Sequence, residues 1–161
     1  MRTPDDPVIL RSEGLYCPAG DFFIDPWQPV PRAVITHAHG DHARPGSGEY
    51  RCVAACVPLL HARLGADARL RPLEYGEPFE LGSARVSLHP AGHILGSAQV
   101  RIETAGRVCV VSGDYKRQPD PTCAPFEPLR CDVFITEATF ALPIYRWRPT
   151  QEVAQQVLDW W

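Results

Sequence analysis

The segment from His37 to His42 constrains this chain most, because it reads His-Ala-His-Gly-Asp-His and follows directly on the β-branched run Ala33–Thr36. Such a run predicts a buried strand. In an extended chain His37 and His39 point to the same face. The glycine that follows lets the backbone turn, so an aspartate and a third histidine can reach a second coordination position. Imidazole nitrogens suit zinc, and a carboxylate oxygen also accepts manganese or iron. Three of the chain's six histidines lie here, which favours a metal site over a His-rich surface loop.

The His-x-His-x-Asp-His pattern after a strand resembles the signature of the metallo-β-lactamase fold. Three later motifs resemble those of the β-CASP nucleases, the nucleic-acid-processing branch of that family, and they stand in the family's order: Pro90–Ala98, Ser112–Tyr115 and Thr136–Phe140. Asp25 stands where the family has its first acidic motif, and the residues from Leu15 to Trp27 are most similar to those of bacterial DNA ligase-associated exonucleases. The resemblance covers nearly the whole chain.

The resemblance implies an α/β, β-rich fold, namely the N-terminal half of the metallo-β-lactamase αββα sandwich, truncated at the start of the β-CASP insert. It divides the chain into residues 1–145, the first part of a metallo-β-lactamase-like domain, and residues 146–161, the start of a helical insert. In the family a further metal-binding histidine comes from beyond that insert, and no histidine follows His93 in this chain. We therefore expect the N-terminal part of a longer enzyme, whose intact form is the nuclease, and we expect this 161-residue part alone to be impaired.

The resemblance also implies a site for two divalent metal ions, zinc or manganese. The expected ligands of the first ion are the imidazoles of His37, His39 and His93. Those of the second ion are Asp41 and His42. Asp114 is expected to be shared by both ions. Two such ions activate a water and clamp the scissile phosphate, so Asp41, Asp114 and Glu137 are the candidate catalytic residues.

Two acidic residues outside the ligand set have weaker support. Asp25 could accept a hydrogen bond from a ligand histidine and fix its tautomer, or it could be a turn residue before Pro26. Glu137 could orient the site, or it could be a helix cap or a loop acid. His89 is expected to be a partly buried polar residue, and His61 is expected to lie on a helix surface. A second zinc site made of Cys52, Cys56 and His61 can be imagined, but a strand followed by a helix start is the preferred interpretation.

Most of the sequence predicts short strands, at Phe22–Asp25, Ala33–Thr36, Tyr50–Ala54, Ala84–His89, Ala98–Glu103, Arg107–Ser112 and Val133–Thr136. A hairpin turn is predicted at Thr104–Gly106. Val57–Leu64 predicts a helix with a proline in its first turn and a glycine after its end. A second helix is predicted to begin directly after Thr150, with Thr150 as its N-cap.

Composition fits one globular domain, with 161 residues of which 45% are hydrophobic. No apolar run approaches the roughly 18 residues of a membrane span, and the N-terminus does not resemble a signal peptide. We therefore expect a cytoplasmic protein with reduced thiols. The net charge of −3 does not by itself indicate nucleic-acid binding, in which a basic face supplies most of the affinity.

The preferred function is a metal-dependent nuclease, more specifically a DNA ligase-associated exonuclease that acts on DNA ends in repair, with a DNA ligase and a helicase as partners and no membrane. The alternative is an RNA-processing ribonuclease of the same superfamily, because the metal chemistry is identical. A small-molecule hydrolase on the same fold is disfavoured by the His93 and Glu137 motifs. A non-enzymatic alternative is an inactive truncated fragment that binds metal weakly.

Overall fold

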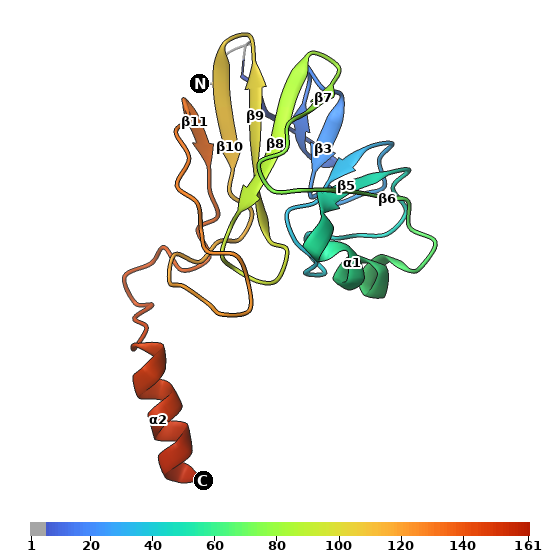
Figure 1. Ribbon diagram of the computed structural model, residues 1–161. Coiled ribbons are helices and arrows are strands. Elements are labelled where there is room, and N and C mark those ends of the chain that lie inside the picture. The colour runs from blue at the N-terminus through green and yellow to red at the C-terminus, as the bar shows by residue number, and fades with distance from the viewer. Residues whose placement is uncertain (1–5) are drawn as a thin grey trace.

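The computed structural model describes residues 6–161 and is built around two β-sheets (Figure 1). The first sheet follows the order of the chain, with strands β1 (Ile9–Arg11), β2 (Gly14–Cys17), β3 (Phe22–Ile24), β4 (Ala33–Val34), β5 (Tyr50–Val53) and β6 (Leu70–Leu73). Strands β1 to β3 pair antiparallel, and the pairs from β3 to β6 are parallel.

The second sheet has the order β11-β10-β9-β8-β7, with β7 (Phe79–Leu81), β8 (Ala84–Pro90), β9 (Ala98–Thr104), β10 (Arg107–Val111) and β11 (Val133–Ile135). Its pairs are antiparallel except that β11 runs parallel to β10. Ala105 (φ 49°) and Gly106 (φ 76°) join β9 to β10. Two positive φ angles are what a type I′ turn requires, so the predicted hairpin is confirmed.

The apolar core lies between the two sheets. Ile24 and Val34 of the first sheet belong to one buried cluster with Leu88 and Val100 of the second, and each is at most 1% exposed. Burying such side chains is the main favourable contribution to folding. Two β-sheets around one core, with few helices, confirm the β-rich metallo-β-lactamase class that the sequence predicted.

A short helical segment covers the other face of the first sheet. It consists of η1 (Ala54–Cys56), a 3₁₀ turn, and α1 (Val57–Leu64), whose Leu60 is fully buried in a second apolar cluster with Ile35 and Tyr50. The helix has the predicted bounds.

The strand before the first metal motif is shorter than predicted. β4 contains only two of the four residues expected to be extended. Ile35 N–H still donates to the Arg51 carbonyl at 2.9 Å, but Thr36 N–H donates to Asp25 Oδ1 at 2.8 Å. A side-chain acceptor therefore replaces the strand partner at Thr36, and the chain leaves the sheet one residue before His37.

The C-terminal segment is exposed. Helix α2 (Thr150–Trp160) has no buried residue and extends away from the sheets (Figure 1). The prediction of Thr150 as N-cap is wrong, because Thr150 is the first helical residue and the cap position is Pro149, which makes no side-chain cap hydrogen bond. Within residues 6–161 neither this helix nor any other is both long and apolar enough to cross a bilayer.

Candidate metal centre

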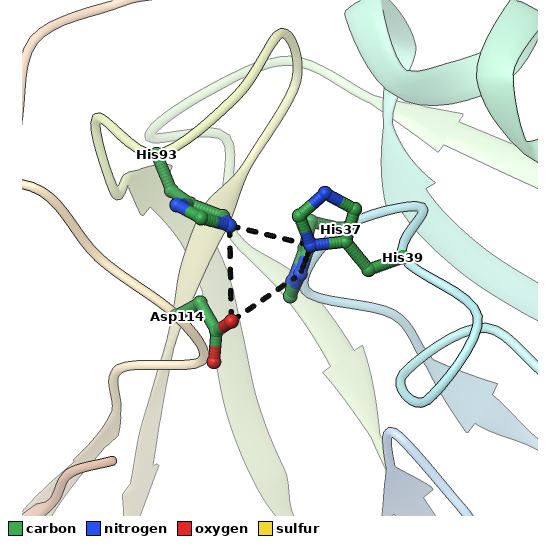
Figure 2. A group of neighbouring side chains, drawn as sticks. All are labelled: His37, His39, His93 and Asp114. Atoms are coloured by element: carbon green, nitrogen blue, oxygen red, sulfur yellow. Dashed lines mark hydrogen bonds and ion pairs between the residues drawn. The ribbon is translucent and has the colours of Figure 1, made fainter. Parts of the chain in front are cut away.

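Three loops bring the metal-capable side chains together beside the ends of the two sheets (Figure 2). His37 and His39 lie on the loop after β4, His93 on the loop between β8 and β9, and Asp114 on the loop after β10. One donor atom from each of the four lies within 4.8 Å of all the others. The topology thus assembles a cluster from segments that are distant in the sequence.

The distances within this cluster fit a tetrahedral zinc ion. His39 Nδ1 lies 3.0 Å from His37 Nε2 and 3.3 Å from His93 Nε2. Asp114 Oδ2 lies 3.9 Å from His37 Nε2 and 3.7 Å from His93 Nε2. Ligand atoms at the usual distance from a tetrahedral zinc are about 3.3 Å apart. Three imidazoles and a carboxylate at these separations are therefore a suitable donor set for zinc.

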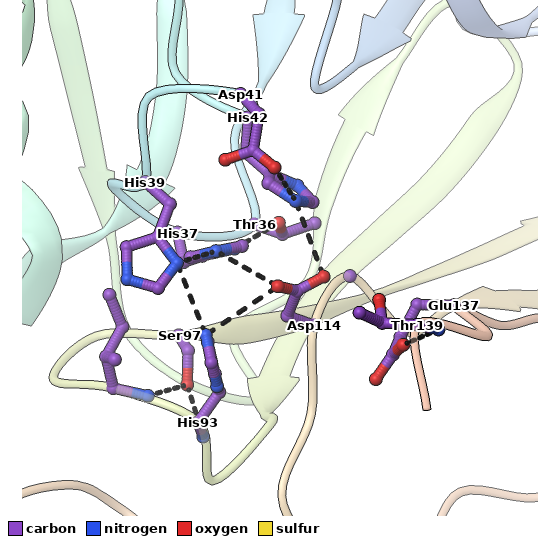
Figure 3. A network of polar contacts seen from close by, with 12 residues as sticks. Thr36, His37, His39, Asp41, His42, His93, Ser97, Asp114, Glu137 and Thr139 are labelled. Atoms are coloured by element: carbon purple, nitrogen blue, oxygen red, sulfur yellow. Dashed lines mark hydrogen bonds and ion pairs between the residues drawn. The ribbon is translucent and has the colours of Figure 1, made fainter. Parts of the chain in front are cut away.

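A second group of donors lies on the other side of Asp114 (Figure 3). His42 Nε2 is 3.4 Å from Asp114 Oδ1 and 3.6 Å from Asp41 Oδ2. The two oxygens of Asp114 thus face different groups, because Oδ2 is the one near His37 and His93. The structure brings all six predicted ligands into one neighbourhood. Asp41 is the most open of them, with 75% of its side chain exposed.

Asp25 orients two of the histidines. Its Oδ2 accepts a hydrogen bond from His42 Nδ1 at 2.8 Å and one from the Thr36 hydroxyl at 2.5 Å. Because that hydroxyl proton is used on the carboxylate, Thr36 Oγ1 is the acceptor for His37 Nδ1, 3.0 Å away. Both imidazoles then carry their proton on Nδ1 and present an Nε2 lone pair to the site.

The loop that carries His93 is held by Ser97. The buried Ser97 hydroxyl accepts hydrogen bonds from the backbone N–H groups of His93 and Ile94, at 3.0 and 3.2 Å. Gly96 (φ 72°) lies so close to Cys56 that a Cβ would be 2.4 Å from the Cys56 nitrogen. Only glycine fits this position, and the close approach fixes the loop against η1.

Burial and neighbouring charges determine the protonation of the cluster. Burial, aided by the nearby imidazoles, lowers the pKa of His37 to about 2, and burial also lowers the pKa of His93. Burial acts on His42 in the same direction, but its hydrogen bond to Asp25 and the surrounding carboxylates outweigh that effect and raise its pKa. His37 and His93 are therefore neutral at pH 7, the form in which imidazole binds a metal.

A cleft of about 350 Å³ opens beside the second group of donors. Apolar and polar side chains both line it, and the lining residues include Leu15, Ile24, Asp25, Trp27, Asp41, His42, Arg44, Asp114, Ile135 and Glu137. Glu137 accepts the Thr139 N–H at 2.8 Å through its carboxylate, as Figure 3 shows. Glu137 thus lies on the wall of the cleft, outside the four-residue donor cluster.

The remaining histidines and cysteines lie elsewhere. His61 Nδ1 interacts with the Gly65 carbonyl at the end of α1. His89 lies between Ser87 and Glu127, at 2.9 and 3.2 Å. Cys52 and Cys56 are buried, and within residues 6–161 they join no metal-capable cluster. A second zinc site at these cysteines is thus not formed in the described part of the chain.

The chain is similar to several curated proteins, although no protein-family model matches it. It is 34% identical to a probable DNA ligase of Opitutus terrae, over 92% of this chain and 15% of that protein. It is 32% identical to ribonuclease TTHA0252 of Thermus thermophilus, over 86% of this chain and 38% of that protein. The chain therefore spans less than half the length of these relatives.

Among solved structures, the chain aligns with a Cronobacter sakazakii metallo-β-lactamase that is mutated in its HARLDQ motif. The alignment has a TM-score of 0.47 and 16% identity, and it covers 66% of this chain and 58% of that one. The fold itself is established by the two facing sheets, with the metal-capable side chains on the loops at their strand ends. The chain has the metallo-β-lactamase fold, and nucleases are among the proteins to which its sequence is similar.

Proposed function

We propose that the chain carries the two-metal site of a nuclease, and that this nuclease is a DNA ligase-associated exonuclease acting on DNA ends. The observation that carries the proposal is the position of Asp114. One of its oxygens faces His37 and His93, and the other lies 3.4 Å from His42 Nε2. A carboxylate with one oxygen directed at each group is suited to bridge two ions.

The proposed ligands form two sets that share Asp114: His37, His39 and His93 for the first ion, and Asp41 and His42 for the second. When bound, two divalent ions lower the pKa of a water between them and offset the charge that develops on a phosphodiester. Zinc suits this nitrogen-rich set, and the carboxylates also accept manganese.

The chain's other residues would position these groups. Asp25 and Thr36 hold two imidazoles in the tautomer that leaves Nε2 free. The carboxylate of Glu137 lines the same cleft as Asp114, where it can orient the attacking water or the scissile phosphate.

The choice of DNA is supported by the similarity to a probable DNA ligase, of which this chain matches a 15% portion. A nuclease-like segment within a ligase would trim the ends that the ligase joins, so a DNA ligase and a helicase of cytoplasmic repair are the proposed partners. The similarity to a ribonuclease over 86% of the chain supports a second candidate function, RNA processing at the same metal site.

We infer the following division of the chain. Residues 1–145 form the metallo-β-lactamase-like part that carries every proposed ligand, and residues 146–161 form the start of a helical insert. In support, α2 makes no buried contact, whereas the described strands before it form the two sheets.

Cleavage of end-labelled single strands of DNA and RNA, in zinc and in manganese, tests the proposed function. We expect the chain to shorten DNA from an end only weakly, because no histidine follows His93, and we expect Asp114→Ala to remove this activity because neither ion keeps its shared ligand. His61→Ala, on the surface of α1, is the matched control and should retain the activity. Cleavage that survives Asp114→Ala would contradict the two-metal mechanism, and faster cleavage of RNA would favour the second candidate.

A further inference from the structure

We propose that the cleft beside the metal centre holds the end of a nucleic-acid single strand, with one unpaired base stacked on Trp27 and an adjacent phosphate bound by Arg44. The proposal rests on the proposed nuclease function and deepens it, because it names the form of the substrate and two residues that grip it.

Trp27 presents a half-exposed indole to the cleft. It is 48% exposed, and it lines the same cleft as His42 and Asp114. A large aromatic side chain normally contributes to the core when it can. An indole that instead faces a cleft next to metal-capable side chains is suited to stack on a planar ligand. Stacking on an aromatic side chain is how proteins hold unpaired bases of any sequence.

The backbone around Trp27 is held in place, which fixes the point from which the indole extends. Trp27 N–H donates to the Glu13 carbonyl at 2.7 Å. Gly14 (φ 135°) packs under this turn, because a Cβ there would be 3.3 Å from Pro26 Cα. The turn begins at Asp25 (φ 43°), whose carboxylate is bonded to Thr36 and His42. A backbone held in this way loses little conformational entropy on binding.

Arg44 supplies a positive charge at the same cleft. It is exposed and lines the cleft two residues after His42. Its carbonyl accepts the Tyr50 hydroxyl at 3.0 Å, which anchors its backbone. Within residues 6–161 its guanidinium forms no ion pair, whereas the Arg51 and Lys116 side chains each pair with a carboxylate. A free guanidinium can bind a phosphate with two parallel hydrogen bonds.

Together these groups match the parts of one nucleotide. The indole suits the base, the guanidinium suits a phosphate, and the cluster at Asp114 suits the scissile diester. The cleft volume of about 350 Å³ is in the range of small-ligand sites. In a duplex each base is stacked on its neighbours and paired, so it offers no free face. We therefore expect a preference for single-stranded ends.

The test measures the affinity of the zinc-loaded 161-residue chain for two fluorescein-labelled strands of the same length. One is a thymidine oligonucleotide and the other is an abasic strand. Binding is followed by stopped-flow fluorescence anisotropy, before turnover. Trp27→Ala should weaken binding of the thymidine strand about tenfold or more and leave binding of the abasic strand unchanged. Trp27→Phe should keep most of the affinity. Arg44→Ala should weaken binding of both strands and reduce the salt dependence by about one phosphate contact.

Trp147→Ala is the matched control, because Trp147 is 73% exposed and does not line the cleft. It should change neither affinity. An equal loss on both strands after Trp27→Ala, no loss at all, or equal affinity for a duplex would overturn the proposal.

Hydrolysis of bis(p-nitrophenyl) phosphate by the wild-type chain separates this inference from the proposed function. Zinc-dependent hydrolysis together with base-independent binding would overturn the stacking site while the nuclease function stands. A Trp27-dependent preference for bases without any diester hydrolysis would support the stacking site and contradict the nuclease function.

Discussion

Thr36 connects more parts of the centre than any single ligand does. Its backbone N–H and its hydroxyl both donate to Asp25, and its hydroxyl accepts from His37. Its carbonyl accepts the Ala98 N–H at 2.8 Å, and Gly113 lies directly against its side chain. One buried threonine thus ties the first metal motif to the acidic turn after β3, to the start of β9 and to the loop after β10.

We predict that Thr36→Val weakens zinc binding about 10- to 100-fold, the usual cost of losing a hydrogen-bond partner of a ligand. Valine has the same shape, but it can neither donate to Asp25 nor accept from His37. Thr36→Ser should restore most of the affinity. Thr122→Val, which removes an exposed hydroxyl bonded to Asp120, is the control.

Chelator competition measures the zinc affinity, and ¹⁵N NMR reports the tautomer of His37. An unchanged affinity in a folded Thr36→Val protein would show that the Asp25–Thr36 contacts do not support the ligands.

At this scale the sequence could indicate the ligands and one supporting residue, Asp25, but not the other supports. His37 and His39 were predicted because chelation leaves a short local pattern. Thr36, Ser97 and Trp27 carry no such pattern. A threonine at the end of a β-branched run predicts only a strand, and its role here depends on Asp25, which is distant along the chain.

At the scale of elements, the sequence predicted most strands of the core and missed four short ones: β2 inside the first sheet, and β1, β6 and β7 at sheet edges. β8 and β9 alternate apolar and polar residues over seven positions, and β10 contains an apolar run, so all three could be predicted. β1 and β6 lie at opposite edges of the first sheet. Both contain charged residues, and β6 also contains Pro72. Proline and charged side chains are usual on edge strands, but in a sequence they favour a loop. Pairing with a neighbouring strand is what makes these segments extended.

The cysteines provide a test of this arrangement. Cys17, Cys52, Cys56 and Cys109 are buried in β2, β5, η1 and β10, whereas the loop cysteines Cys123 and Cys131 are partly exposed. Burial raises the pKa of Cys52 to about 12, of Cys56 to about 11 and of Cys109 to about 12. The buried thiols are therefore protonated at pH 8, where the thiolate is the reactive form.

We predict that a thiol reagent at pH 8 labels Cys123 and Cys131 in the native protein and the other four only after denaturation. Mass spectrometry of tryptic peptides identifies the labelled positions. The double substitution Cys123→Ser and Cys131→Ser should leave the native protein unlabelled. Rapid labelling of Cys52 or Cys109 would show that the sheets do not pack as described.

At the scale of the whole molecule, the proposed metal centre joins the two sheets. His37, His39, Asp41 and His42 belong to the loop after β4 of the first sheet, while His93 and Asp114 extend from β8 and β10 of the second. The overall class could be predicted because several motifs, in order along the chain, resemble those of the metallo-β-lactamase fold. The mutual approach of the sheets depends on the shared core, which no local pattern specifies.

The number of metal ions bound per chain tests the central claim most directly. After saturation with zinc and dialysis, elemental analysis should find about two zinc ions per wild-type chain, as two ligand sets with a shared carboxylate require. Asp114→Ala should lose at least one of them, while His61→Ala keeps both. A wild-type chain that retains one ion or none, or an Asp114→Ala chain that retains two, would contradict the two-metal centre.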